Sequence, residues 1–214
     1  MQKYFLDNNS DKLILFFTGW GCDENQFVNL TAQDDLLLLF DYQNLDLDFD
    51  FSKYKEINIL AYSAGVFISS IIDKKIQNVN KKIAINGNPY LFDENLGLTK
   101  ALVQEFREIN LDNYLDFRRK YMTETDEEYE KYNKLQSLRT LESCQSELDA
   151  LERVYLEEKN NINPNFDKAI IAENDIIFNA ENQKEFYKDK IKLLPNAKHH
   201  IFFKFKTYEE ILEF

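Results

Sequence analysis

The feature that most constrains the fold is a five-residue stretch between an apolar run and an apolar helical pattern. Ala61-Tyr62-Ser63-Ala64-Gly65 follows the apolar run 57–60 and precedes the helical pattern 66–72. Strand, sharp turn and helix are the context in which a G-x-S-x-G sequence holds a serine hydroxyl at the edge of a sheet. The first glycine is replaced by Ala61, which adds one methyl group. The alternative is an ordinary strand-to-helix turn made of small residues.

Composition excludes several classes of function. The chain has 214 residues and a formal net charge of −12, which argues against binding the phosphates of DNA or RNA. Its longest apolar runs are far shorter than the roughly 20 residues of a membrane span, and no apolar signal segment opens the sequence. We therefore expect a soluble, cytoplasmic, monomeric protein without nucleic-acid or membrane partners.

Cysteine and histidine are too few for a structural metal site. Cys22 and Cys144 lack paired-ligand spacing, and the two histidines are adjacent at positions 199 and 200. We expect neither a metal nor an organic cofactor.

Apolar runs of strand length alternate with helical patterns. This alternation predicts right-handed crossovers and a mostly parallel central sheet flanked by helices, an α/β fold. The alternating segment 44–51 could be a strand, but its aspartates favour an extended connection along the sheet. The predicted strands are 12–17, 35–42, 56–62, 82–87, 168–175 and 190–194. The predicted helices outside the insertion are a short one that is capped by residues 23–25 and runs through residue 30, and those at 64–75, 179–189 and 207–212.

The character of the chain changes between the fourth and fifth predicted strands. Glycine and proline disappear between residues 98 and 160, and apolar residues recur at helical spacing. We predict a helical insertion over about 94–165 that covers the sheet as a lid. The whole chain, 1–214, is then a single domain.

Three side chains suited to activating a serine follow predicted strands. Ser63 lies in the turn, Asp175 ends the fifth strand, and His199 follows the sixth, next to His200. The order Ser, Asp, His is that of α/β-hydrolases, where an imidazole takes the serine proton and a carboxylate orients the imidazole. Asp175 could instead cap the next helix, and the histidines could be surface or core residues. Asp93 and Asp167 are the rival acids.

Activated-serine chemistry also needs two backbone donors for the developing oxyanion. They typically come from the residue after the nucleophile and from the loop after an early strand. Ala64 and Trp20 occupy these positions, the latter between two glycines. A core or interface role for the Trp20 ring is compatible, since the proposed donor is its backbone.

Several segments together resemble the BioG-type pimeloyl-[acyl-carrier protein] methyl ester esterases of biotin synthesis. The resemblance spans the chain and is weakest across the insertion. It implies a serine esterase that frees the terminal carboxylate of pimeloyl-acyl carrier protein, with Ser63 as nucleophile, His199 as base and Asp175 as its acid. It is carried by Phe16-Phe17-Thr18-Gly19-Trp20-Gly21, Phe40-Asp41-Tyr42, Ala61-Tyr62-Ser63-Ala64-Gly65-Val66, Ala84-Ile85-Asn86-Gly87, Asn174-Asp175-Ile176-Ile177-Phe178 and His199-His200-Ile201-Phe202.

The arginines give independent support for an acidic carrier-protein partner. All five fall inside the insertion and could form ion pairs with such a partner. Arginine is also a good helix former with many nearby glutamates, so local pairing is the alternative. The arginines are Arg107, Arg118, Arg119, Arg139 and Arg153, of which 118 and 119 are the preferred docking residues.

Two alternative functions remain. One is a broader short-chain carboxylesterase or thioesterase, and the other is a non-catalytic carrier-binding protein.

Overall fold

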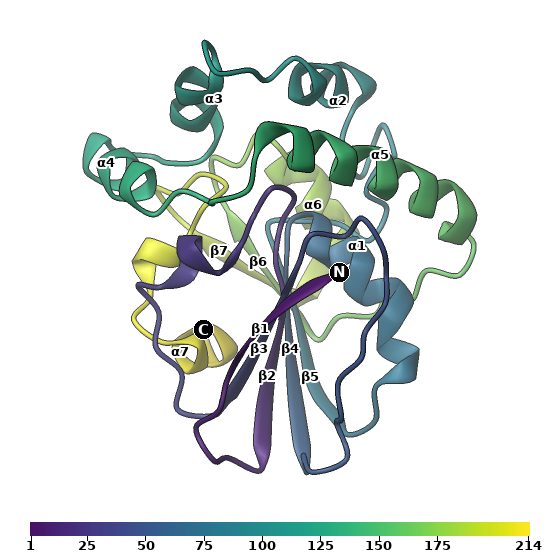
Figure 1. Ribbon diagram of the computed structural model, residues 1–214. Coiled ribbons are helices and arrows are strands. Elements are labelled where there is room, and N and C mark those ends of the chain that lie inside the picture. Colours follow the sequence, from purple (N-terminus) through teal and green to yellow (C-terminus); the bar gives the residue numbers. More distant parts are fainter.

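A seven-stranded sheet forms the centre of the computed structural model, which describes residues 1–214 (Figure 1). The strand order is β1-β3-β2-β4-β5-β6-β7, and every neighbouring pair is parallel except β1 with β3. The mostly parallel sheet agrees with the sequence prediction. The strands are β1 (Gln2–Leu6), β2 (Lys12–Phe17), β3 (Asp35–Phe40), β4 (Glu56–Tyr62), β5 (Val79–Ile85), β6 (Lys168–Ala172) and β7 (Ile191–Leu194).

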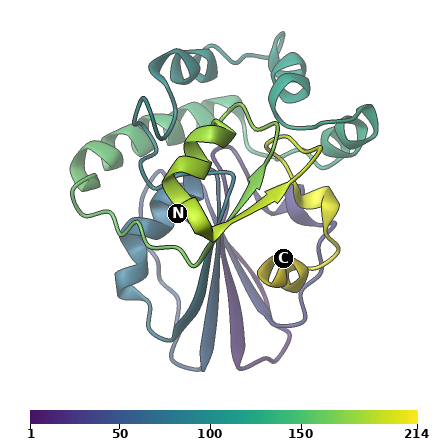
Figure 2. The ribbon, with the colours of Figure 1, turned by 180° about the vertical axis from the view of Figure 1, so that it is seen from behind.

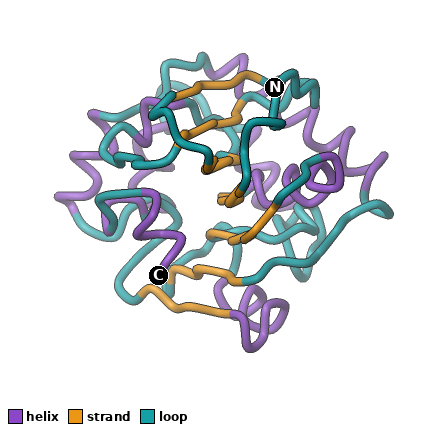
Figure 3. Tube along the Cα trace, turned by 90° about the horizontal axis from the view of Figure 1, so that it is seen from below, coloured by secondary structure: helices purple, strands orange, loops and turns teal.

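The central strands are apolar on both faces because both faces are covered. Along β2, Leu13 and Leu15 belong to one hydrophobic core and Ile14 to the other. The larger core includes side chains of α1 (Ala64–Ile72) and α6 (Ala180–Tyr187), and the smaller includes α7 (Tyr208–Glu213). Figures 2 and 3 show these helices on opposite sides of the twisted sheet.

The first strand was not predicted from the sequence. All five residues of β1 are exposed, and it pairs antiparallel along the outer edge of β3, with Tyr4 opposite Leu38. An edge strand that buries few side chains needs no apolar run, so its pairing depends on the neighbouring strand rather than on its own composition.

The insertion between β5 and β6 is broken into four helices, which lie across one end of the sheet (Figure 1). Threonine side chains at 99, 125 and 140 accept backbone N–H groups at the starts of three of them. The third of the four helices ends at Lys134, and Leu138, which lies beyond it, is 78% exposed. The helices are α2 (Lys100–Arg107), α3 (Tyr114–Tyr121), α4 (Asp126–Lys134) and α5 (Leu141–Glu158).

Other differences from the prediction concern element ends. The strand expected over 168–175 stops at Ala172, and the fourth predicted strand begins earlier, at Val79. Segment 44–51 forms no strand and packs apolar side chains against the larger core, as an extended connection should. Single 3₁₀ turns are η1 (Glu24–Phe27), η2 (Asp73–Lys75), η3 (Lys188–Lys190) and η4 (Phe202–Lys204). None of the helices has the length and apolar character needed to cross a membrane.

Candidate active site

Ser63 sits in a strained turn between β4 and α1. Its backbone has φ 55° and ψ −125°, outside the regions that side chains normally allow. The turn is possible because Gly65 packs directly under β2, where an added Cβ would lie 2.3 Å from the Phe17 carbonyl oxygen. Ala61 is fully buried within β4, so its methyl group is accommodated. The serine is thereby held at the carboxyl edge of the sheet.

His199 bridges Ser63 and Asp175. Its Nε2 lies 2.9 Å from the Ser63 Oγ, and its Nδ1 lies 3.0 Å from the Asp175 Oδ2. With the carboxylate holding the proton on Nδ1, Nε2 is free to accept from the serine hydroxyl. All three residues are at most 8% exposed. The structure therefore brings together three residues that lie 24 and 136 positions apart along the chain.

Asp175 is fixed by contacts other than the one to His199. Its Oδ1 accepts the backbone N–H groups of Ile177 and Phe178, at 2.9 and 3.3 Å. The sequence left open that Asp175 caps the next helix, but the N-cap of α6 is Asn179. The rival acids Asp93 and Asp167 instead accept backbone N–H groups of their own surroundings.

Asn86, at the end of β5, is a positioning residue that sequence reasoning did not single out. Its Nδ2 donates to the carbonyl of His199 at 2.7 Å, and its Oδ1 accepts the Ala172 N–H at 2.7 Å. One buried amide thus joins β5, β6 and the loop that carries the imidazole. An asparagine before a glycine at a strand end is the only local signal, and it is equally typical of a simple turn.

His200 faces away from the serine. Its ring packs against Tyr132 of α4, with centroids 4.7 Å apart, and against Phe203 at 4.8 Å. Burial, together with smaller contributions from the nearby His199 and Arg118, lowers its pKa to about 3. His200 is therefore a neutral core residue, and of the two histidines only His199 contacts Ser63.

The loop after β2 runs beside Ser63, where a Cβ added at Gly19 would lie 3.1 Å from the serine Cβ, and the next residue, Trp20, lines the same cavity as Ser63. The Trp20 backbone N–H has no partner in the protein. Ala64 is the first residue of α1, so its N–H has no intrahelical partner either. The Trp20 indole donates to the Cys144 carbonyl at 2.6 Å and stacks on Phe106 at 5.1 Å. Both proposed oxyanion donors are thus free, and the indole anchors the loop to the insertion.

Glu147 is the second residue that the sequence did not reveal. Its carboxylate, fully buried on α5, accepts the N–H groups of Gly21 and Tyr42, each at 2.9 Å. Arg139 donates to the same carboxylate at 2.6 Å and to Asp41 at 2.8 Å. Burial raises the pKa of Glu147, while Arg139 and the two N–H donors oppose that rise. Nothing local distinguishes it from the many other glutamates of the insertion.

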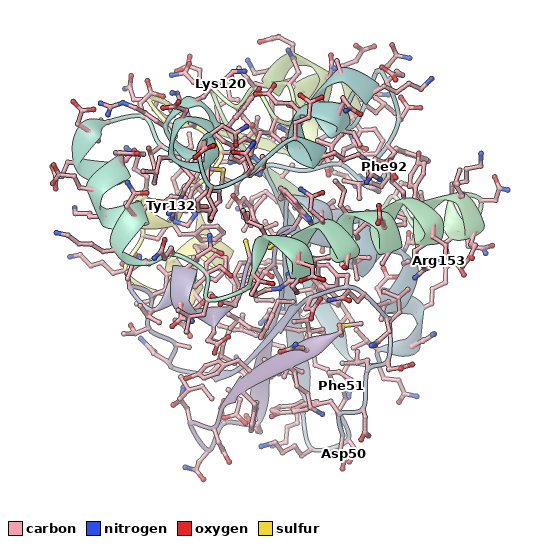
Figure 4. The ribbon with its side chains drawn as sticks, turned by 45° about the horizontal axis from the view of Figure 1, so that its top comes forward. Asp50, Phe51, Phe92, Lys120, Tyr132 and Arg153 are labelled. Atoms are coloured by element: carbon pink, nitrogen blue, oxygen red, sulfur yellow. The ribbon has the colours of Figure 1, made fainter.

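The arginines do not form the single docking surface that the sequence suggested. Arg118 is buried and the side chain of Arg139 is only 7% exposed, so neither lies on the surface that a protein partner would contact. Arg107 pairs with Asp149 and Glu152, and Arg119 pairs with Asp126. Arg153, near the outer end of α5 (Figure 4), is exposed and has no carboxylate within 4.0 Å.

A cavity of about 590 Å³ lies between the insertion and the sheet and reaches Ser63 and His199. Nineteen of its 29 lining residues are hydrophobic, so it suits an apolar chain. Phe106, Leu111 and Tyr114 of the insertion line it, whereas Leu102 does not. A hydroxyl hydrogen-bonded to an imidazole beside two free N–H groups and an apolar cavity is an arrangement capable of acyl transfer.

Comparison with known proteins gives a family match over nearly the whole chain. A family model described as "Pimeloyl-ACP methyl esterase BioG" matches residues 1–211. A curated "Malonyl-[acyl-carrier protein] O-methyltransferase" of Bacteroides fragilis is 32% identical over 179 residues. That match covers 80% of this chain but only 36% of the relative's length.

Two solved structures have a fold similar to that of this chain. BioG from Haemophilus influenzae superposes with a TM-score of 0.87 at 27% identity, covering 98% of this chain and 99% of that one. A lipase-esterase related protein from Clostridium acetobutylicum gives a TM-score of 0.64 at 20% identity, covering 94% and 92%. The predicted α/β-hydrolase fold is confirmed.

Proposed function

This chain belongs to the BioG family of pimeloyl-ACP methyl esterases, and we propose that it hydrolyses the methyl ester of pimeloyl-[acyl-carrier protein] with Ser63 as nucleophile. The observation that carries the proposal is the 2.9 Å contact between the Ser63 Oγ and the His199 Nε2. The carrier-protein substrate named for the Bacteroides relative is consistent with a carrier-bound acyl substrate here.

The reaction follows from the proton positions. Ser63 attacks the ester carbonyl while His199 Nε2 takes the hydroxyl proton, and Asp175 stabilises the imidazolium through Nδ1. His199 then gives the proton to the departing methoxide, and methanol leaves an acyl-enzyme. Water, deprotonated by the same nitrogen, attacks this acyl group and regenerates Ser63 with release of the carboxylic acid.

Two backbone donors serve the tetrahedral intermediates. The N–H groups of Trp20 and Ala64 would hold the negative oxygen, as the absence of protein partners on them allows. Losing one such donor commonly costs about 3 kcal/mol of transition-state stabilisation. The loop from Gly19 to Gly21 therefore matters for rate as well as for packing.

The helical insertion acts as the lid of the site in this proposal, within a single domain that spans the chain. Carrier proteins are acidic, and this protein is acidic too, so docking needs local positive charge. Arg153 is the best placed of the five arginines because it is exposed and unpaired. Arg119 and Arg107, both on the surface of the lid, are already paired with carboxylates and would have to exchange partners.

Replacement of the nucleophile separates an enzyme from a binding protein. We expect Ser63→Ala to lower turnover of a short-chain chromogenic ester by about 10⁴-fold or more, because the attacking oxygen is lost. Ser69→Ala, a buried serine further along α1 that bonds only the Val66 carbonyl, is the matched control. Hydrolysis that survives in the Ser63 variant, or that is absent from the native protein, would favour a non-catalytic carrier-binding protein.

A second experiment separates the pimeloyl esterase from a broader carboxylesterase or thioesterase. Expression of the protein in a strain that lacks its pimeloyl methyl esterase should restore growth without biotin, and the Ser63→Ala variant should not. Ester hydrolysis in vitro without rescue of growth would point to the broader enzyme.

A further inference from the structure

The loop that carries His199 is bonded to the insertion as well as to the sheet. On the side of the sheet, Asn86 Nδ2 donates to the His199 carbonyl at 2.7 Å. On the side of the insertion, the Tyr121 carbonyl accepts the His199 N–H at 3.3 Å. The Met122 carbonyl accepts the N–H of the next residue, His200, at 2.9 Å. Two different regions of the molecule therefore fix the backbone that holds the imidazole beside Ser63.

The two carbonyls of the insertion lie at the C-terminal end of α3. Tyr121 is the last residue of this helix, and Met122 is its C-cap. The last carbonyls of a helix have no intrahelical N–H partner, and they carry the negative end of the helix dipole. Both residues are buried, so these acceptors need donors from the protein. The loop of His199 supplies them.

Neighbouring contacts fasten the same helix end to the loops of the site. Lys198 Nζ donates to the Arg119 carbonyl at 3.3 Å. Asn174, the residue before the acid of the site, donates from Nδ2 to the Glu124 Oε2 at 3.1 Å. We call residues 119–124 the α3 end. It contacts both the loop that carries the imidazole and the loop that carries the carboxylate.

The α3 end is held within the insertion by side chains of its own. The Tyr121 hydroxyl donates to the Glu105 Oε2 of α2 at 2.6 Å. On the other side, Arg118 Nη2 donates to the Tyr132 carbonyl of α4 at 2.7 Å. The position of the two carbonyls that face His199 and His200 therefore depends on how α2, α3 and α4 pack together.

We propose that the α3 end positions His199, so that the insertion takes part in the chemical step and does not only cover the cavity. The inference rests on the proposed function in that His199 is the base of the reaction. Proton transfer requires the His199 Nε2 to keep its 2.9 Å distance from the Ser63 Oγ. A misplacement of about 1 Å lowers a rate by about 10²-fold, so the bonds that fix this loop matter for the rate.

A lid that only covers the cavity would act through binding. A change in its fit would raise KM for esters whose acyl chain fills the cavity of about 590 Å³. A positioning element acts on kcat, and it does so even for an acetyl ester, which occupies little of that space. The two roles therefore separate in the kinetics of one small ester, p-nitrophenyl acetate.

Removal of one backbone N–H tests the proposal directly. His200→Phe is compared with a protein that carries 3-phenyllactic acid at position 200, in which an ester oxygen replaces the N–H. That oxygen cannot donate to the Met122 carbonyl, so kcat should fall about tenfold with KM nearly unchanged. The control is 3-phenyllactic acid in place of Phe214, whose N–H donates to the Glu210 carbonyl in α7, away from the cavity. The control should keep the native kcat.

A milder change weakens the acceptor and leaves His200 in place. Lactic acid at position 123 is compared with Thr123→Ala; it makes the Met122 carbonyl an ester carbonyl, which accepts hydrogen bonds less well. The Thr123 N–H has no partner in the protein, so no other bond is lost. We expect kcat to fall by about two- to fivefold.

The proposal is overturned if kcat is unchanged in both ester-containing proteins, or if only KM rises. The comparison at position 123 decides the matter if the protein altered at position 200 does not fold. A native protein that hydrolyses no ester would overturn the proposed function and this inference with it. Native hydrolysis that is insensitive to both backbone changes would overturn this inference alone.

Discussion

The sheet and the helical insertion share one hydrophobic core but are built differently. Strands β2 and β3 are buried along almost their whole length by apolar side chains on both faces. Helices α2 to α4 are short, with eight or nine residues each, and the insertion meets the site through directed polar bonds such as those of Glu147. The proposed reacting groups thus stand at the ends of buried strands, whereas many of the groups that would surround the acyl chain stand on these shorter helices.

The largest effect should come from a change confined to the sheet region. Asp175→Asn keeps the shape of the side chain but favours the imidazole tautomer that cannot accept the serine proton, so we expect kcat to fall by about 10⁴-fold. Steady-state hydrolysis of a chromogenic ester measures the loss. Asp167→Asn changes the rival acid, which accepts the Lys82 N–H, and serves as the control. Similar losses in both variants would mean that Asp175 acts through folding alone.

A contact between the two regions should have the next largest effect. Glu147→Gln places an NH₂ group against N–H donors and removes a charge partner of Arg139, so the Gly21 loop should loosen. We expect kcat to fall by about 10- to 100-fold, with KM changing less, because the oxyanion donors lose their geometry.

The same variant should lower the free energy of unfolding by about 3 kcal/mol, since a buried pair is broken. Chemical denaturation measures this change, and Glu142→Gln, exposed on the same helix, is the matched control. A loss of stability without any loss of kcat would show that Glu147 fastens the insertion but does not position the loop.

His200, packed between the regions, should make stability depend on pH. Its folded-state pKa of about 3 lies below the ordinary value of 6.5, so the unfolded chain binds more protons between these values. Stability should therefore fall as the pH falls from about 6.5 towards 3, by up to about 1.4 kcal/mol per pH unit. Urea unfolding of native and His200→Phe protein at pH 4.5, 5.5 and 7 checks this. Parallel curves for the two proteins would rule it out.

The smallest effect should come from the outer surface of the insertion. Figure 4 marks Arg153 there, with Lys120 on α3. Arg153→Glu should weaken hydrolysis of the carrier-bound ester by about two- to tenfold at low salt, because rim charges act mainly on association. The ratio of that rate to the rate on a small neutral ester is the measurement. Arg153→Gln should give an intermediate ratio, and a ratio independent of both charge and salt would exclude docking at this position.

Sequence patterns predicted the sheet better than the insertion. A buried parallel strand is a continuous apolar run, and the turn at Ser63 needs small neighbours, so both are visible within a few residues. The arginines show the opposite case. Arg118 and Arg119 are adjacent in the chain, yet one is buried and the other exposed on the same helix. Their different environments follow from how α3 packs, which charge counting does not reveal.

By itself the sequence determined the α/β class, the positions of the parallel strands, and the three side chains that follow them, because apolar periodicity and strand-end residues are local properties. Only the tertiary structure decided which histidine contacts Ser63, that Glu147 accepts N–H groups 105 and 126 positions away, and that Arg118 is buried without a counter-charge. These features arise where distant segments meet, and no pattern within one segment contains the geometry of such a contact.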